Sequence, residues 1–222
     1  PDRAQTTKFL GEIRPWSQFL TAIQAELEAQ RAKQGAGLRL LTGTIVSPTL
    51  ADQIAQVLAS YPQAQWVQWE AVSRDHARAG AKQAFGEDVE PVYRFDRAKV
   101  VLSLDADFLT EGPGRLRYTR DFIDGRRLRD GRAEMNRLYV VESTPTPTGL
   151  KADHRLALRA ADIDGFARAV AAGLGVAGAS GEAPAGVPAG FVPALVKDLL
   201  AHKGAALVVA GPLQPPAVHA LA

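Results

Sequence analysis

The sequence lacks cysteine altogether and holds a single methionine, Met135, among its 222 residues. Without a thiol these residues can form no disulfide, thiolate zinc site, iron–sulfur cluster or cysteine nucleophile. The sequence also lacks any apolar run near the roughly 20 residues that a membrane helix needs, and no charged-then-apolar signal pattern opens it. These absences predict a chain with no direct membrane span and no thiol-based chemistry.

Excess charge of one sign is also missing, because 26 basic residues stand against 24 acidic ones and leave a net charge of +2. Nucleic-acid binding usually needs a strongly basic surface, so we expect no nucleic-acid partner. Hydrophobic residues at 46% and charged residues at 23% are the proportions of a globular domain. The residues after Pro215-Pro216 read as a helix start and predict a fragment truncated at its C-terminus.

Hydrophobic spacing predicts an N-terminal arm followed by alternating strands and helices. Residues 15–31 place apolar side chains at helical intervals, so residues 1–37 are predicted to form an amphipathic arm. Residues 38–222 are predicted to form one domain, interrupted at 175–190 by a flexible Gly-, Ala- and Pro-rich loop. The predicted strands are residues 38–46, 65–70, 100–104, 138–141 and 206–209. The predicted helices are residues 47–61, 74–85, 115–123, 163–174 and 192–202.

This alternation favours an α/β fold with a mainly parallel sheet and helices on both faces, as in dinucleotide-binding domains. Ligands of such sheets bind beyond the carboxyl ends of the strands. The candidate binding residues at those positions are Asp105, Glu142, Ser143, Thr144 and Gly211. An acid such as Glu142 can accept the two hydroxyls of a ribose or two N–H groups of a guanine. The alternative for Glu142 is a solvated strand-end acid or a helix-cap partner.

Sharper chemical motifs are absent. The sequence has neither the G-x-G-x-x-G nor the G-x-x-x-x-G-K-[ST] phosphate-binding pattern, its four histidines are scattered, and no G-x-S-x-G nucleophile turn occurs. Asp105 and Asp107 alternate at a strand end and should point to opposite sides. Gly112-Pro113-Gly114 is either an anion-binding turn or, as we favour, a plain tight turn. We therefore expect no catalytic residue and no metal site.

Several stretches resemble the molybdopterin oxidoreductase family. They are residues 138–149 (LYVVESTPTPTG), 151–156 (KADHRL) and 163–167 (IDGFA). Residues 103–109 (SLDADFL), together with Gly112-Pro113-Gly114, Tyr118 and residues 120–122 (RDF), are more similar to the iron–sulfur subunit of alternative complex III, a bacterial quinol:acceptor oxidoreductase of the respiratory chain. The resemblance runs from about residue 38 to residue 222.

The function that we infer from the resemblance depends on the positions where this chain departs from the family pattern. Family members usually carry Asp-Pro-Arg after the strand, where this chain has Glu142-Ser143-Thr144, and an Asn-bearing turn in place of Asp105-Ala106-Asp107. We therefore predict a cofactor-free scaffold domain, with vestigial binding residues at Asp105, Glu142, Ser143, Thr144 and Gly211. Glu142, Ser143 and Thr144 are then expected to organise the following Pro-Thr turn. The implied partners are other subunits of a membrane-associated complex, with iron–sulfur clusters outside this fragment and a periplasmic location.

Two alternatives remain open at this point. The chain could be part of a working molybdoenzyme that binds the guanosine end of a molybdopterin guanine dinucleotide through Glu142, Thr144 and the Gly211 turn. It could also be a stand-alone nucleotide-binding protein, which the truncated C-terminus disfavours.

Overall fold

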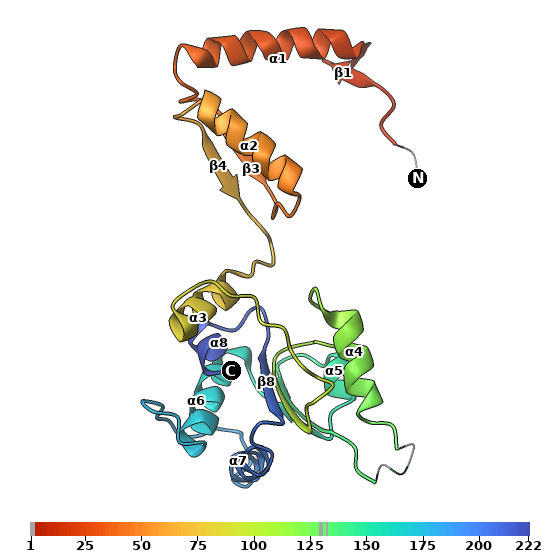
Figure 1. Ribbon diagram of the computed structural model, residues 1–222, viewed down its shortest axis with the longest axis vertical. Helices are drawn as coiled ribbons and strands as arrows, with labels where there is room; N and C mark the ends of the chain where they lie inside the picture. Colours follow the sequence, from red (N-terminus) through yellow and green to blue (C-terminus); the bar gives the residue numbers. More distant parts are fainter. Residues whose placement is uncertain (1–2, 129–130, 132) are drawn as a thin grey trace. The chain divides into compact units, whose positions relative to one another are not determined.

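The computed structural model in Figure 1 describes residues 3–128, 131 and 133–222. Contacts within the chain define two compact units, an N-terminal unit, Pro1–Ala71, and a C-terminal unit, Val72–Ala222. The predicted boundary between the arm and the α/β domain, at residue 37, lies inside the first of these units.

The N-terminal unit combines a hairpin, a helix and a small βαβ motif. Its elements are β1 (Thr7–Phe9), β2 (Glu12–Arg14), α1 (Trp16–Arg31), β3 (Arg39–Thr42), α2 (Pro48–Ser60) and β4 (Gln65–Gln68). β1 and β2 pair antiparallel, whereas β3 and β4 pair in parallel with α2 crossing between them. The Ser47 hydroxyl caps α2 by accepting the Leu50 N–H at 3.3 Å, and Pro48 occupies the first helical position.

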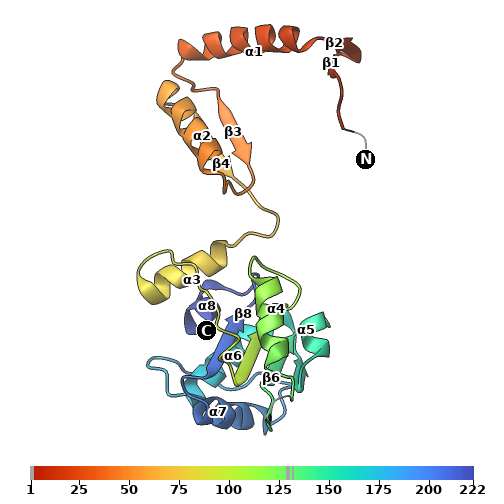
Figure 2. The ribbon, with the colours of Figure 1, turned by 45° about the vertical axis from the view of Figure 1, so that its right-hand side comes forward.

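The C-terminal unit is built on a four-stranded parallel sheet flanked by helices (Figure 2). Its elements are α3 (Asp75–Phe85), β5 (Val100–Leu104), α4 (Arg115–Asp124), β6 (Arg137–Glu142), α5 (Pro147–Leu150), β7 (His154–Ala157), a 3-10 turn (Ala160–Asp162), α6 (Ile163–Gly173), α7 (Phe191–Ala201), β8 (Ala206–Ala210) and α8 (Pro216–Leu221). The strand order is β7-β6-β5-β8, so the direction of winding reverses between β5 and β8. Open parallel sheets usually bind ligands at such a reversal.

Alternate residues of the central strands face two separate cores. On the side of α4, Val101 and Val140 pack with an aromatic cluster of Phe95, Phe108 and Phe122. The rings of Phe95 and Phe108 stack at 4.4 Å, and Phe108 meets Phe122 edge-on at 5.4 Å. The opposite core, beneath α6, α7 and α8, includes Val100, Leu102, Val141, Ile163, Phe166, Leu195 and Val218. Both faces of the sheet are therefore covered, as parallel sheets require.

The α/β class with a mainly parallel sheet is confirmed, but the prediction of one continuous sheet is wrong. The strands predicted at 38–46 and 65–70 shorten to β3 and β4, which within the described residues pair only with each other. The hairpin β1–β2 and the edge strand β7 were not predicted, because each has three or four residues with little apolar alternation. Strand pairing depends on distant packing, which the spacing inside one strand does not encode.

The aromatic cluster under α4 gives the first testable prediction. Phe122 is fully buried, so Phe122→Ala should lower the free energy of unfolding of the C-terminal unit by about 3–5 kcal/mol through lost burial and a cavity. Urea unfolding followed by circular dichroism measures the change. Phe85→Ala is the matched control, because Phe85 is 69% exposed and its loss should cost less than about 0.5 kcal/mol. Equal losses for the two variants contradict this packing.

Candidate functional site

The carboxyl ends of β5, β6 and β8 bring together most of the residues that the sequence singles out. Asp105 follows β5, Glu142 ends β6 and Gly211 follows β8. Ser143 joins them through its backbone N–H, which donates to Asp105 Oδ1 at 3.2 Å. Thr144 is exposed. The vestigial role of these five residues in cofactor binding stays a prediction, and their geometry shows what else they do.

Glu142 is a buried carboxylate that is supplied with donors from its own chain. Its Oε2 accepts the Thr146 hydroxyl at 2.7 Å, and its Oε1 accepts the Thr146 N–H at 3.4 Å and Arg155 Nε at 2.5 Å. A buried carboxylate is costly unless it is paired and hydrogen-bonded, and Arg155 and Thr146 meet that need. Gly149 passes so close that a Cβ there would lie 1.8 Å from Glu142 Oε1. Glu142 therefore organises the turn that follows it.

The crevice between β5 and β8 is filled by protein atoms. Asp105 adopts the left-handed backbone conformation, with φ of 56°, and its Oδ2 accepts Gln214 Nε2 at 3.3 Å. Gly211 packs against Asp105 so closely that a Cβ would lie 1.9 Å from the Asp105 carbonyl oxygen. Gln214 is only 3% exposed, and its Oε1 is buried without a partner in the described part of the chain. The usual ligand position of the sheet is thus closed by the chain itself.

Asp107 contacts a different set of groups from Asp105. Its Oδ1 accepts the Thr148 N–H at 3.1 Å and the Thr148 hydroxyl at 2.5 Å, and the Thr110 hydroxyl also donates to its carboxylate. The two aspartates therefore share no ligand position. Across residues 3–128, 131 and 133–222, no group of three or more His, Asp or Glu side chains has an arrangement that could hold a metal ion.

The sequence pattern did not reveal the partners of these acids. They are Thr110, Thr146, Thr148, Arg155 and Gln214. Thr146 alone carries a local signal, because a Thr followed by Pro147 is typical of a helix N-cap, and its hydroxyl accepts the Gly149 N–H at 3.1 Å. Arg155 and Gln214 carry none, because each meets its acid only once the strands have assembled.

The Gly112-Pro113-Gly114 turn is covered by an aromatic ring. The Arg115 N–H donates to the Gly112 carbonyl at 3.3 Å, and a Cβ on Gly114 would lie 2.2 Å from the Tyr118 ring. Tyr118 belongs to α4 and accepts the Tyr93 N–H at 3.3 Å through its hydroxyl oxygen. The tight turn at the start of α4 is therefore used for packing.

A half-buried histidine lies where α8 packs against α3. A Cβ on Gly80 of α3 would lie 2.4 Å from His219 Cβ, so the contact needs glycine. His219 Nε2 is buried and has no partner among the described residues. Burial, and next the nearby charge of His76, lower the pKa of His219 below 6.5, while the Gln214 backbone acts in the opposite direction. The neutral imidazole is therefore the form that the fold accommodates.

The N-terminal unit has its own strand-end contact. Glu70, just after β4, accepts the Thr44 N–H at 2.6 Å, and this bond holds the pKa of Glu70 below its usual range. Trp66 Nε1 donates to the Thr42 hydroxyl at 3.0 Å. The first contact ties the loop after β3 to the loop after β4, and the second joins the two strands themselves.

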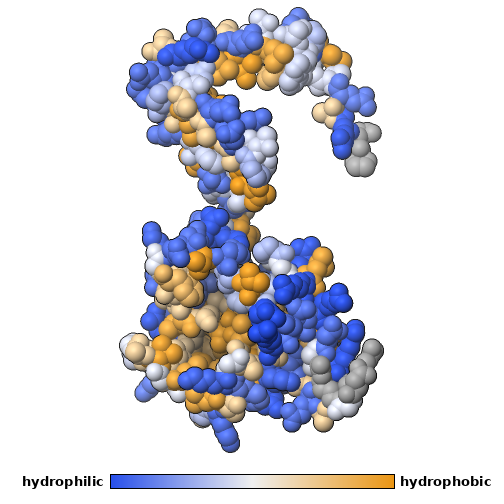
Figure 3. All heavy atoms as spheres, in the orientation of Figure 1, coloured by the Kyte–Doolittle hydropathy of each residue, from blue (hydrophilic) through white to orange (hydrophobic). Residues whose placement is uncertain are grey.

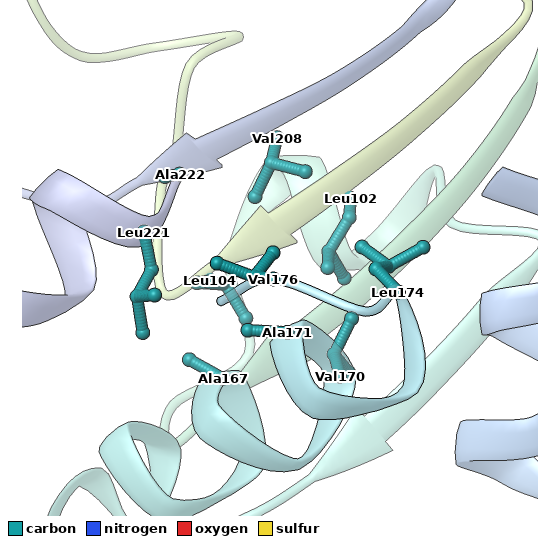
Figure 4. A pocket seen from close by; sticks show the side chains of 10 residues that line it. All are labelled: Leu102, Leu104, Ala167, Val170, Ala171, Leu174, Val176, Val208, Leu221 and Ala222. Atoms are coloured by element: carbon teal, nitrogen blue, oxygen red, sulfur yellow. The ribbon is translucent and has the colours of Figure 1, made fainter. Parts of the chain in front are cut away.

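An apolar groove lies between the sheet and α6 (Figure 4). Its lining residues are Leu102, Leu104, Ala167, Val170, Ala171, Leu174, Val176, Val208, Leu221 and Ala222. Small-molecule sites usually combine apolar walls with a few polar groups that fix the ligand's orientation. This lining contains no polar side chain, so the groove offers a packing surface.

No helix in the described residues combines the length and the apolar character that a membrane crossing requires.

No protein-family model matches this sequence, and no curated protein sequence is significantly similar to it. A solved structure with a similar fold is a chain of the formyltransferase/hydrolase complex (FhcABCD) from Methylorubrum extorquens, determined in complex with methylofuran. The two chains share 18% sequence identity with a TM-score of 0.52, over 87% of this chain and 52% of that chain. This chain therefore spans about half the length of that FhcABCD chain, and the similarity shows a shared fold.

The resemblance to molybdopterin oxidoreductases is wrong, and so is the respiratory quinol:acceptor function that it implied. No family model supports it, and the similar solved structure belongs to a formyltransferase/hydrolase complex. The alternative of a working molybdoenzyme that binds guanosine through Glu142, Thr144 and Gly211 is overturned by the same findings. The residues behind the resemblance have a structural explanation, because Glu142, Thr146 and Arg155 link the end of β6 to α5 and β7.

The close approach of Gly149 to Glu142 gives a second prediction. Gly149→Ala should lower the free energy of unfolding by about 1–3 kcal/mol, because the new methyl group overlaps the Glu142 carboxylate. Denaturant unfolding measures the change. Gly190→Ala is the matched control, because a Cβ at Gly190 meets no atom within 4 Å. An unchanged Gly149→Ala protein contradicts the buried position of Glu142.

His219 gives a prediction about pH. Its pKa is lowered in the folded chain, so below about pH 6.5 the unfolded chain takes up a proton that the folded chain does not. The stability that His219 contributes is therefore complete above that pH and declines as the pH falls through 6.5 towards the lowered pKa. Urea midpoints at about pH 7.5 and about pH 5.5 should differ less for His219→Gln than for the unaltered chain. The same difference in both proteins contradicts this role of His219.

Proposed function

We propose that this chain is an assembly subunit, or part of one, in a multisubunit complex of the formyltransferase/hydrolase kind. In this role it supplies an α/β body to which other subunits attach, and the reaction takes place on those subunits. The proposal assigns no bound cofactor to the strand ends of the C-terminal unit.

One observation carries the proposal, namely that the chain itself occupies the strand-end site. Asp105, Asp107 and Glu142 each accept hydrogen bonds from neighbouring segments of the chain, and Gly211 and Gln214 pack against Asp105 between β5 and β8. A general acid or base must reach the proton that it transfers, and the buried carboxylates of Asp107 and Glu142, each bonded to donors of their own chain, do not meet that condition. The edge that usually carries function in this fold thus stabilises the protein.

The similarity in fold supports the proposed class of partner, which is the other subunits of a multisubunit complex. The FhcABCD chain with the similar fold comes from a multisubunit complex, and the shared fold extends over 87% of this chain. The groove under α6 is a further apolar surface without polar lining, which suits protein packing better than substrate binding. Partner subunits of an enzyme complex account for both features.

The test is purification of the tagged chain from its native host together with its partners. We expect a complex that catalyses formyl transfer or hydrolysis in the presence of methylofuran, whereas the isolated chain should be inactive. Asp105→Asn should leave the kcat of the complex unchanged, because asparagine also tolerates the left-handed backbone at this position.

Two outcomes contradict the proposal. One is formyl-transfer activity of the isolated chain. The other is a loss of roughly 10²–10⁴-fold in kcat for a folded Asp105→Asn complex, which is the size expected when a general acid or base is removed.

A further inference from the structure

Helix α1 carries an apolar stripe that no other element of the N-terminal unit buries. The stripe consists of Trp16, Phe19, Leu20, Ile23 and Leu27, which lie within an arc of about 100° at 3.6 residues per turn. The first four are 60%, 43%, 42% and 40% exposed, and α1 contains no buried residue. Apolar side chains gather along one side of this helix in Figure 3. Most helices in proteins are stabilised by packing of such an apolar face. The exposed stripe of α1 is therefore expected to have a partner surface.

The β3–β4 pair has an open face of its own. Leu41 and Val67 are direct cross-strand neighbours and are 73% and 49% exposed. Leu40 and Trp66, which alternate with them, are partly buried. Figures 1 and 2 show α2 along this pair of strands. Parallel strands are found almost only where helices cover both faces of the sheet, so the open face requires a second helix.

The junction between α1 and β3 prevents α1 from folding back onto this face. Tyr61 is buried, and its hydroxyl donates to the Leu27 carbonyl at 3.4 Å. The Gly37 N–H donates to Gln30 Oε1 at 3.0 Å, and the Gln63 N–H donates to the Gln34 carbonyl at 2.9 Å. These bonds fix the end of α1 against the segment between α2 and β4. Within the N-terminal unit, neither apolar surface is therefore covered by the other.

The polar side of α1 argues against a lipid surface as that cover. Helices that lie on membranes usually carry several lysines or arginines on the polar face. In α1 the charged residues are Glu26, Glu28 and Arg31, which leave a net negative charge. Arg31 also pairs with Glu28 at 3.1 Å. The pattern fits a protein surface.

We propose that two copies of this chain associate through their N-terminal units, with the stripe of α1 from each copy covering the open β3–β4 face of the other. Each copy offers one uncovered helix face and one sheet face that needs a helix, so a two-fold arrangement satisfies both at once. The charges agree with this pairing. Glu26 borders the stripe beside Phe19, Arg39 lies on the same sheet face as Leu41, and neither has an ion-pair partner among the described residues.

The absence of cysteine allows a direct test by cross-linking. Ile23→Cys and Val67→Cys are introduced into separate full-length chains that carry different tags, and the mixture is treated with a short bis-maleimide. We expect cross-links between the two chains. Leu116→Cys mixed with Val67→Cys is the control, because Leu116 is 80% exposed but lies on α4. A cross-link within the doubly substituted chain, or one only between two Ile23→Cys chains, overturns the proposal.

Sedimentation gives an independent measurement. The unaltered chain should have the mass of a dimer, and Phe19→Glu should have the mass of a monomer with unchanged circular dichroism. Leu116→Glu, which changes an exposed leucine on α4 outside the proposed interface, should stay dimeric. An unaltered chain that remains monomeric at micromolar concentration, or that sediments with lipid vesicles, rules the arrangement out. This self-association does not depend on the proposed formyltransferase/hydrolase role.

Discussion

The ion pair between Glu142 and Arg155 holds together three consecutive elements of the C-terminal unit. Glu142 ends β6, Thr146 caps α5 and Arg155 lies on β7, and the carboxylate contacts both partners while it is 1% exposed. A charge so deeply buried is tolerated only when it is paired and hydrogen-bonded, so Thr146 must supply its hydroxyl. Gly149 must lack a side chain because a Cβ there would overlap the carboxylate. This carboxylate therefore adds a side-chain link to the backbone pairing that holds the edge strand β7 against β6.

The sequence predicts elements well where the apolar pattern is continuous. β5 spans the predicted residues 100–104, and the helix predicted at 115–123 differs from α4 by one residue. β7 was not predicted, because Leu156 is its only buried residue. The division of the strands into separate sheets was not predicted for a different reason. β3 and β4 resemble core strands in their local sequence, and yet they pair only with each other in the described chain. Local spacing predicts an element, whereas sheet membership depends on contacts between distant residues.

The candidate site shows the same division. Strand-end position alone was enough to single out Asp105, Glu142 and Gly211, because parallel strands bring their carboxyl ends to one edge. Whether such an acid faces a ligand or its own chain depends on Arg155, which lies on the next strand, and on Gln214, which is distant in sequence from Asp105. The family resemblance failed at this step. It rested on residues that the fold needs for its own turns.

The edge strand β8 has a consequence for how the chain folds. Its partner β5 lies about a hundred residues earlier, so their register, Val100 with Ala206 through Leu104 with Ala210, closes a very long loop. Such non-local pairing slows folding, and until it forms the apolar strand ALVVA is available to other chains. Its outer edge also lacks a strand partner within the described residues. Because β8 is synthesised about a hundred residues after β5, β5 stays unpaired on this side until β8 has been made, and β8 is open to intermolecular pairing until the register forms.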